Sequence, residues 1–154
     1  MYKLENLDWL PKPHSLKFIK RKLSDYKYTS AIVFVISNNR TLLVNVKSRG
    51  WDFVGGRIEE GETIKECAKR EFLEETGFSI KKMKFVGSHK IDCFSNPKGS
   101  KTAQAIYIGV IDEKVSELLE DDILECDWFS IHEMKQFNFP EWKYMLINYI
   151  FNIK

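Results

Sequence analysis

The segment from Thr63 to Thr76 predicts an α-helix with carboxylates on its buried face, and this feature limits the fold more strongly than any other. Its ends carry helix signals, because Thr63 and Glu66 have the spacing of a capping box and Gly77 stands where a left-handed residue closes a helix. One helical face begins with apolar residues and continues into three glutamates: Ile64, Cys67, Ala68, Glu71, Glu74 and Glu75. A helix normally turns its charges away from its apolar stripe, so these glutamates need a compensating partner.

The three glutamates predict a metal site. Like charges at i, i+3 and i+4 repel one another, and burial adds a cost of several kcal/mol for each uncompensated ion. A hard divalent cation offsets both penalties, and Mg²⁺ is typically held by a few carboxylates together with waters and substrate phosphates. The alternative is structural, with the glutamates paired to Lys69, Arg70 or more distant lysines at the rim. Spacing alone leaves both interpretations open.

A glycine-rich segment leads directly into this helix. Four of the eight glycines fall within or beside the stretch RGWDFVGGRIEEGE, which spans residues 49–62. Glycine lets the backbone approach a ligand closely, and Arg57 adds a fixed cation beside the glycine pair. The spacing differs from that of the common phosphate-binding glycine loops, so this segment is informative only in combination with the acidic helix.

Together, the loop and the helix resemble the 23-residue box of the Nudix hydrolases. The fixed glycine, glutamate and arginine positions of that box are all present at their spacing: Gly56, Glu62, Arg70, Glu71, Glu74, Glu75 and Gly77. Two departures concern packing. Phe72 and Phe78 occupy the bulky aliphatic positions, and Val54 stands where many members have proline before the glycine pair. The box covers about a seventh of the chain, and so many fixed positions rarely coincide by chance.

This resemblance implies an α/β/α sandwich built on a mixed sheet, with the box forming a loop, a helix and a loop. It further implies a bound divalent metal, which is Mg²⁺ or, as a substitute, Mn²⁺. The implied reaction is hydrolysis of a diphosphate linked to another group. The implied metal ligands are Glu71, Glu74, Glu75 and the backbone carbonyl of Gly55. Glu71 is alternatively the general base, and the resemblance implies that Glu62 and Arg70 form a pair that holds it in place.

A further acidic residue is expected outside the box. Several members of the family place the general base, or one more metal ligand, on a later loop, and the stretch 113–125 of this chain is rich in carboxylates. We favour Glu120, with Asp121 as the alternative, because both stand just before the predicted strand that ends at Trp128 and Phe129.

The residues around the glycine pair are candidates for substrate binding. Lys47, Arg49 and Arg57 flank the loop and are expected to contact the outer phosphates, unless they are simply solvated. Trp51 and Phe53 offer a stacking surface for a base, although alternating aromatic residues beside a strand also suit a hydrophobic core.

Composition predicts one globular domain over residues 1–154, with 1–27 as an N-terminal extension or edge strand. The chain is 44% hydrophobic and 30% charged, and a formal net charge of +2 does not by itself favour nucleic acid or a membrane. Its longest apolar run is far shorter than the roughly 20 residues that cross a bilayer, so we expect no membrane contact and a cytoplasmic location. Cys67, Cys93 and Cys126 lack CxxC spacing and are expected to be reduced and core-filling.

The rest of the chain predicts strands and a closing helix. β-Branched runs at Tyr28–Ser37 and Arg40–Val46 flank Asn38–Asn39, which predicts a hairpin with a positive-φ turn. Further strands are expected at Met83–Ile91, Thr102–Ile111 and Ile123–Phe129, with a turn at 97–99 between the first two. The predicted closing helix has an apolar face formed by Trp142, Met145, Leu146, Tyr149, Ile150 and Ile153.

The text around the box resembles bacterial members that act on nucleoside triphosphates, including oxidised purine triphosphates. Two alternatives remain: removal of pyrophosphate from the 5′ end of RNA, and a non-catalytic nucleotide sensor. RNA would gain support from a basic cluster formed by Lys17, Lys20, Arg21 and Lys22. Sensors usually lose a box glutamate, which this chain retains, and ADP-ribose is disfavoured because Pro97 lies beyond the position of the proline associated with it. The sequence leaves monomer and homodimer equally open.

Overall fold

The computed structural model describes residues 3–5, 14–93, 100–117 and 119–153. Its elements in chain order are β1 (Lys3–Glu5), β2 (His14–Ile19), β3 (Lys27–Ser37), β4 (Arg40–Val46), β5 (Gly50–Asp52), β6 (Val54–Arg57), α1 (Ile64–Thr76), β7 (Phe78–Cys93), β8 (Ser100–Lys114), β9 (Ile123–Phe129), α2 (Ile131–Met134), the 3₁₀ turn η1 (Lys135–Phe137) and α3 (Glu141–Ile153).

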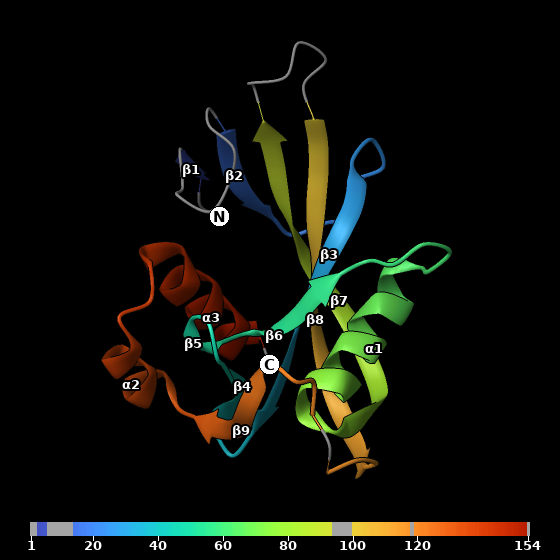
Figure 1. Cartoon of the computed structure of the whole chain (residues 1–154). Coiled ribbons are helices and arrows are strands. Elements are labelled where there is room, and N and C mark those ends of the chain that lie inside the picture. Colours follow the sequence, from blue (N-terminus) through green and yellow to red (C-terminus); the bar gives the residue numbers. More distant parts are fainter. Residues whose placement is uncertain (1–2, 6–13, 94–99, 118, 154) are drawn as a thin grey trace.

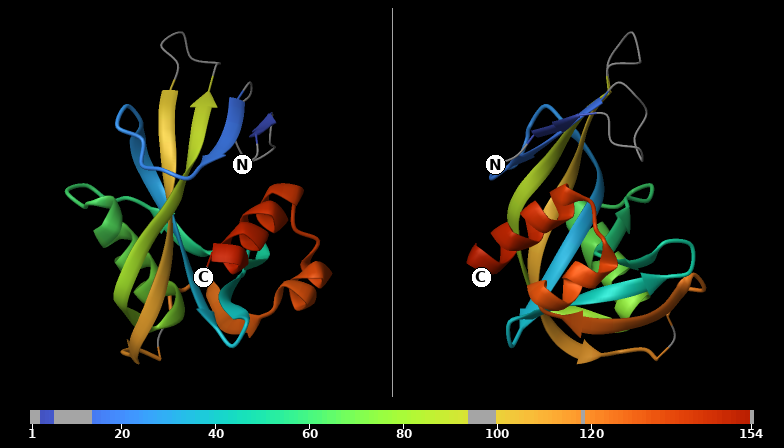
Figure 2. Two further views of the ribbon diagram at one scale, coloured as in Figure 1. Left: turned by 180° about the vertical axis from the view of Figure 1, so that it is seen from behind. Right: turned by 90° about the vertical axis from the view of Figure 1, so that its left-hand side faces the viewer.

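The described strands form one mixed sheet in the order β1-β2-β7-β8-β3-β4-β5, with β6 paired to β3 and β9 paired to β4. Strands β3 and β8 are parallel, whereas β7 and β8 form a long antiparallel ribbon. Helix α1 lies on one side of the twisted sheet, and α2 and α3 lie on the other (Figures 1 and 2). This arrangement confirms the predicted α/β/α sandwich. Among the described residues, no helix has both the length and the apolar character that crossing a bilayer demands.

Each side of the sheet has its own hydrophobic core. The α3 side packs residues such as Phe34, Ile106 and Leu146. The α1 side packs Phe72 together with small or β-branched residues such as Val33. Strand β3 supplies both cores, because neighbouring residues along it point to opposite faces. The thiols of Cys67 and Cys126 are free and pack in the α1-side core, while the side chain of Cys93 lies outside the described part.

Local sequence signals predict most of the element positions correctly. Asn38 and Asn39 have φ values of 48° and 61°, as the predicted hairpin requires. Strand β7 begins at Phe78, five residues before the predicted start, because the left-handed Gly77 turns the chain straight from α1 into the sheet. The predicted turn at 97–99 lies outside the described residues.

The closing helix is present, but its predicted apolar face is correct only in part. Met145 and Ile153 are each 38% exposed, whereas Ile147 is completely buried. The buried stripe of α3 is formed by Trp142, Leu146, Ile147 and Ile150. The stripe is rotated because α3 packs these residues into the same core as Phe18 and Ile106, a tertiary contact that helical periodicity does not encode.

Candidate active site

Helix α1 has the ends that the sequence predicts. The side chain of Thr63 accepts a hydrogen bond from the backbone N–H of Glu66, and the Glu66 carboxylate accepts one from the backbone N–H of Thr63. At the other end, Gly77 adopts φ 77° and donates its N–H to the carbonyl of Leu73. These caps fix both ends of the helix that carries the box glutamates.

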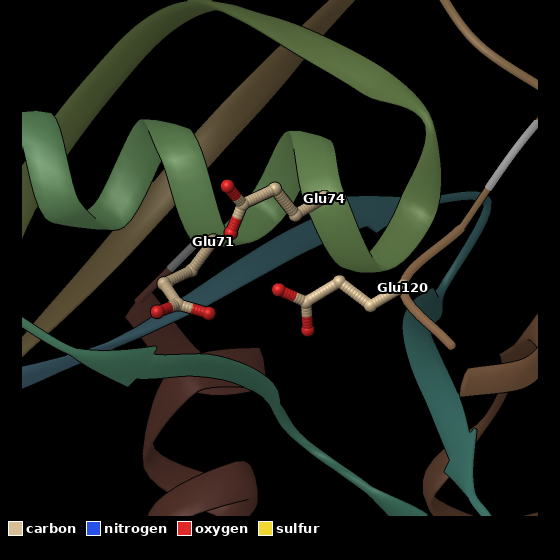
Figure 3. Close-up of side chains that lie close together, drawn as sticks. All are labelled: Glu71, Glu74 and Glu120. Atoms are coloured by element: carbon tan, nitrogen blue, oxygen red, sulfur yellow. The ribbon is translucent and has the colours of Figure 1, made fainter. Parts of the chain in front are cut away.

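Three carboxylates converge at one side of α1. Glu71, Glu74 and Glu120 each offer an oxygen atom, and these atoms lie within 4.8 Å of one another (Figure 3). Glu120 comes from the segment between β8 and β9, and its backbone N–H donates to the carbonyl of Glu74 at 3.0 Å. The same segment is fastened to α1 through Gly77, whose carbonyl accepts the N–H of Val115 at 2.8 Å.

Glu75 lies apart from this cluster and faces β6. It is only 5% exposed, and its carboxylate accepts the backbone N–H of Gly55 at 3.0 Å. Burial, with added repulsion from Glu71 and Glu120, raises the pKa of Glu75 to about 8, although the Gly55 hydrogen bond opposes that shift.

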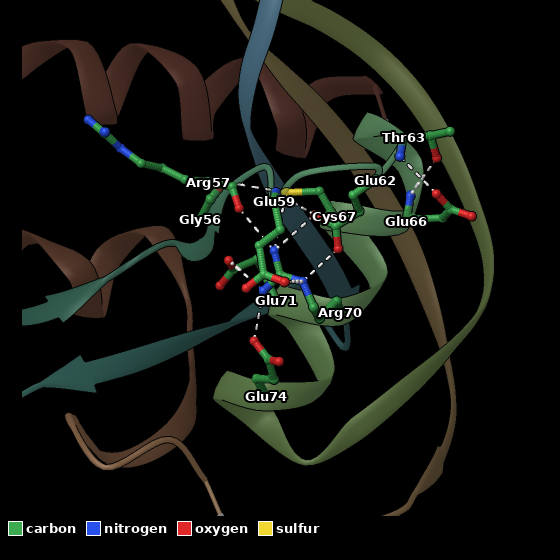
Figure 4. Close-up of polar contacts among 10 residues, drawn as sticks. All are labelled: Gly56, Arg57, Glu59, Glu62, Thr63, Glu66, Cys67, Arg70, Glu71 and Glu74. Atoms are coloured by element: carbon green, nitrogen blue, oxygen red, sulfur yellow. Dashed lines mark hydrogen bonds and ion pairs between the residues drawn. The ribbon is translucent and has the colours of Figure 1, made fainter.

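Arg70 joins the box carboxylates to one another (Figure 4). Its Nε and Nη2 bind the two oxygens of Glu62 at 2.6 and 3.0 Å, and its Nη1 donates to Glu71 and Glu74, both at 2.9 Å. A further bond runs from Nη2 to the carbonyl of Arg57. One guanidinium therefore compensates three carboxylates and ties α1 to the end of β6.

The pKa values of these carboxyl groups diverge. Hydrogen bonding to Arg70 holds the pKa of Glu62 below its ordinary value. Burial raises the pKa of Glu71, and Arg70 offsets part of that increase. Burial, the hydrogen bond with Glu74 and repulsion from Glu71 raise the pKa of Glu120 to about 7. Burial is the main cause for Glu71 and Glu120, and repulsion between neighbouring carboxylates adds to it.

The donor set fits a hard divalent cation. Oxygen atoms from three carboxylates face one another, and the hydrogen bonds of Arg70 described above reach only two of them, Glu71 and Glu74. Carboxylate oxygens are the ligands that Mg²⁺ and Mn²⁺ prefer, and a cation among Glu71, Glu74 and Glu120 would remove the remaining repulsion.

Two glycines let β6 lie against these glutamates. A Cβ at Gly56 would stand 2.3 Å from the carboxyl carbon of Glu71, and a Cβ at Gly55 would stand 2.1 Å from the carbonyl oxygen of Ala31 on β3. The two glycines therefore have different structural roles. Gly56 leaves room for the Glu71 carboxylate, and Gly55 lets β6 pair closely with β3.

A pocket of about 770 Å³ borders the other side of the glycine pair, and we call it the α3-side pocket. Its lining comes from strands β3, β7 and β8, the β5–β6 segment and the start of α3: Thr29, Ser30, Ala31, Ile32, Arg49, Asp52, Phe53, Gly55, Gly56, Arg57, Ile91, Thr102, Gln104, Pro140, Trp142 and Lys143. The pocket and the carboxylates share β6, so a ligand seated in the pocket can extend across the glycine pair toward the glutamates.

The structure divides the predicted substrate-binding residues into two groups. Arg49, Phe53 and Arg57 line the α3-side pocket. Trp51 does not, because its ring packs against Phe129 and Phe137 at centroid distances of 4.7 and 5.9 Å. Lys47 also lies outside the lining, exposed, with its backbone N–H bonded to the carbonyl of Asp122.

Several pocket residues are not indicated by any sequence pattern. Asp52 forms ion pairs with Lys143 at 2.6 Å and with Arg49 at 2.7 Å, and Gln104 on β8 lines the same space. Burial raises the pKa of Asp52, but the two cations more than offset this and hold it below its ordinary value. No local pattern links positions 52, 104 and 143, so only the fold reveals their proximity.

Sequence comparison agrees with this architecture. A NUDIX domain profile matches residues 27–149. The oxidized purine nucleoside triphosphate hydrolase of Danio rerio is 31% identical over 108 residues, which are 67% of this chain and 66% of that enzyme. The putative 8-oxo-dGTP diphosphatase YtkD of Bacillus subtilis is 42% identical over 50 residues, 32% of each chain. The chain therefore belongs to the Nudix hydrolase family, and its match spans just under two thirds of the fish enzyme.

Solved structures share the fold. The Bacillus subtilis pyrophosphohydrolase BsRppH superposes with a TM-score of 0.65 at 22% identity, covering 92% of this chain and 80% of that one. A NUDIX hydrolase from Nitrosomonas europaea gives a TM-score of 0.60 at 26% identity, covering 73% of this chain and 77% of that one. The first likeness extends over most of the chain and concerns the fold alone.

Proposed function

We propose that this chain is a divalent-metal-dependent nucleotide pyrophosphohydrolase whose leading substrate is an oxidised purine nucleoside triphosphate. The observation that carries the proposal is the convergence of Glu71, Glu74 and Glu120 beside β6, which also borders the α3-side pocket. Relatives named for hydrolysis of oxidised purine nucleotides support this substrate class. We place the activity in the cytoplasm, in keeping with the free thiols of Cys67 and Cys126.

We assign Mg²⁺, with Mn²⁺ as a substitute, to the carboxylates of Glu71 and Glu74. Glu75, which lies beside the cluster and faces β6, and the carbonyl of Gly55 are our candidates for the further ligands. When bound, the cation would neutralise phosphate oxygens and make a water molecule more acidic. Arg70 and Glu62 hold the Glu71 carboxylate in position through the contacts described above.

Glu120 is our candidate for the general base. Its carboxylate projects toward Glu71 and Glu74 from a separate segment, so it can reach a water molecule held at that cluster (Figure 3). In the proposed reaction a water attacks a phosphorus of the phosphate chain in line with the leaving phosphate, and the water's proton passes to a Glu120 carboxylate oxygen.

The α3-side pocket is our candidate for the nucleoside. Arg49 and Arg57 line it next to the glycine pair and are positioned to contact the phosphates, while Phe53 and Trp142 supply apolar ring surface. Its volume of about 770 Å³ falls within the range of small-molecule sites.

The test is release of phosphate and pyrophosphate from nucleoside triphosphates, oxidised purine triphosphates, ADP-ribose, dinucleoside polyphosphates and 5′-triphosphate RNA, with Mg²⁺, with Mn²⁺ and with chelator. We expect metal-dependent cleavage that falls by at least about a hundredfold in Glu74→Gln, while the exposed control Glu60→Gln keeps full activity. Nucleotide binding without any cleavage would favour the sensor alternative. Unfolding of Glu74→Gln would assign that residue a structural role.

RNA 5′-end processing is the second candidate, favoured by a basic surface on the opposite side of α1. A hollow of about 560 Å³ between α1 and the β7–β8 ribbon is lined by Lys65, Lys69, Lys81, Lys82, Met83, Lys84, Ile108 and Val110. Five ammonium groups in one hollow suit a phosphate backbone.

The RNA candidate predicts a charge effect confined to long substrates. Changing Lys82 and Lys84 together to Glu should reduce kcat/KM on 5′-triphosphate RNA several-fold, and more at low salt, while hydrolysis of mononucleotides is unchanged. The triple variant of Lys20, Arg21 and Lys22 to Ala tests the N-terminal cluster separately. If a variant affects RNA and mononucleotide hydrolysis equally, the surface that it alters is not an RNA contact.

A further inference from the structure

The floor of the α3-side pocket contains a paired histidine and glutamine. Gln104 on β8 lines the pocket, and His89 is its cross-strand partner on β7. His89 is completely buried, although it is a titratable residue and belongs to no part of the carboxylate site. It lies directly beside a pocket residue, and the proposed mechanism gives it no part.

The histidine holds the glutamine side chain in one orientation. Nδ1 of His89 lies 3.0 Å from Oε1 of Gln104. A carboxamide oxygen only accepts hydrogen bonds, so Nδ1 must carry the proton and donate it. Burial lowers the pKa of His89 to about 4, so the ring is neutral near pH 7.

Aromatic neighbours fix the imidazole itself. Its ring meets Trp142 edge-on at a centroid distance of 5.4 Å and Phe18 at 5.8 Å. Trp142 in turn lines the pocket, so the ring that fixes His89 is also a wall beside Gln104. Strand pairing and ring packing together leave His89 little freedom to turn.

This orientation decides what Gln104 offers to a ligand. Its oxygen is engaged by His89, so the amide nitrogen, a donor of two hydrogen bonds, is the polar group that the side chain can present to the pocket. Within the described part of the chain, no hydrogen bond of that nitrogen is found. A bound base with an acceptor at this point would satisfy it, whereas an amino group there would leave two donors facing each other.

We propose that Gln104 is a specificity-determining residue that favours a keto base over an amino base at this contact, and that His89 is the positioning residue that sets its amide. The inference rests on the proposed function, because it takes the nucleoside to occupy the α3-side pocket. Oxidised guanine carries keto oxygens and therefore fits the donor that Gln104 presents. Adenine carries an amino group at the position where guanine and hypoxanthine carry oxygen.

The test compares ITP with ATP, which differ at the 6-keto and 6-amino position and share sugar and phosphates. We expect the wild-type protein to prefer ITP by roughly tenfold in kcat/KM, chiefly through KM, since a site built to donate rejects a ligand that cannot accept. Gln104→Leu should bring the ratio close to one, chiefly by raising KM for ITP. Gln104→Glu, which keeps the bond from His89 but presents an acceptor, should shift the preference toward ATP.

His89→Phe tests the positioning role. This variant keeps an aromatic ring beside Trp142 but frees the Gln104 amide to turn, so the preference should shrink while kcat stays within a few-fold. Gln136→Leu makes the same chemical change on an exposed residue of η1 and should leave the ratio untouched. Binding of IMP and AMP, which have no anhydride to cleave, provides the same comparison without turnover.

The outcomes separate the two claims. Hydrolysis of ITP and ATP with equal kcat/KM, or a ratio that Gln104→Leu leaves unchanged, would overturn the inference and leave the proposed function intact. A loss of kcat for both nucleotides in His89→Phe at constant KM would assign that residue a structural role only. Absence of both hydrolysis and nucleotide binding in the wild-type protein would overturn the proposed function and the inference together.

Discussion

Arg70 and Glu62 form a two-pronged ion pair, with Nε to Oε1 at 2.6 Å and Nη2 to Oε2 at 3.0 Å. Glu62 precedes α1 and Arg70 lies in its middle, so the pair fastens the loop to the helix. The planar guanidinium matches two carboxylate oxygens at once, which a lysine cannot do. Its remaining nitrogen reaches Glu71 and Glu74, so one side chain links the loop to the carboxylate cluster.

Removal of this cation should destabilise the metal-free protein more than the metal-bound one. Arg70→Gln leaves partly buried carboxylates uncompensated, so we expect a loss of about 2 kcal/mol or more, which is roughly 5 °C in Tm for a chain of this size. Millimolar Mg²⁺ should restore much of the loss because it supplies positive charge to the same glutamates. Thermal unfolding with and without Mg²⁺ measures the effect.

Arg40→Gln is the matched control, since Arg40 pairs with Glu133 at the surface and should change Tm little. A Tm of Arg70→Gln that equals the wild-type value in chelator would show that the carboxylates do not depend on this guanidinium.

Adjacent glycines should respond differently to alanine. In Gly56→Ala the new methyl group displaces only the Glu71 carboxylate, the mobile end of a side chain, so activity should fall about a hundredfold with little change in Tm. In Gly55→Ala the methyl group meets the backbone of β3, so a loss of about 1–3 kcal/mol in the free energy of unfolding is expected. Urea unfolding and turnover, measured on both proteins, separate the two effects. Loss of stability in Gly56→Ala, or loss of activity without loss of stability in Gly55→Ala, would contradict these structural roles.

Burial of His89 should make the fold sensitive to mild acid. Its pKa is about 4 in the folded protein and about 6.5 in the unfolded chain. Between these values the unfolded chain takes up a proton at this residue and the folded protein does not, so the free energy of unfolding falls as pH falls, by at most about 3 kcal/mol. Urea unfolding at pH 7.5 and pH 5 measures the loss.

The difference between variants isolates this histidine from the carboxyl groups that titrate in the same range. His89→Phe should lose less stability on acidification than the wild-type protein. His132→Gln, a change at an exposed histidine, should lose as much stability as the wild-type protein. Parallel pH profiles for wild type and His89→Phe would refute the argument.

The ion pair between Asp52 and Lys143 should be strongly coupled. Their side chains are 17% and 14% exposed, so Lys143→Met leaves a mostly buried carboxylate with only Arg49 beside it and should cost about 3 kcal/mol. Adding Asp52→Asn to that variant should recover part of the loss, with a coupling energy of about 1–3 kcal/mol in a double-mutant cycle. The exposed pair of Lys114 and Glu117 serves as the control cycle and should give under about 1 kcal/mol. Additive effects at Asp52 and Lys143 would mean that the short contact contributes nothing.

The box was predictable from sequence because its signals are local. Caps at Thr63 and Gly77, the helical spacing of the glutamates and the glycine pair all fall within about two dozen residues, so the helix and its acidic face follow from short-range rules. The juxtaposition of Glu120 with the box was inferred from the family resemblance, and the backbone bond from Glu120 to Glu74 shows how the chain achieves it.

The α3-side pocket was not predictable in the same way. Its walls come from segments as distant as Ser30, Gln104 and Lys143, which meet only because β3 and β8 pair in parallel and α3 crosses the sheet above them. Trp51 illustrates the same limit, since the alternation around it suits both a binding surface and a core. Packing against Phe129 and Phe137, more than 70 residues away, decides its place.

The strand shared by the pocket and the carboxylates also separates two kinds of evolutionary change. Gly55 and Gly56 are constrained on the glutamate side, where an added methyl group would meet Glu71 or the backbone of β3. Gln104 and Lys143 line only the pocket and, among the described residues, make no hydrogen bond or ion pair with the box glutamates. Under the proposed function, substitutions there would alter which nucleoside is accepted without touching the box glutamates. If the proposed function holds, descendants of such a chain could acquire new substrates while keeping the same reaction.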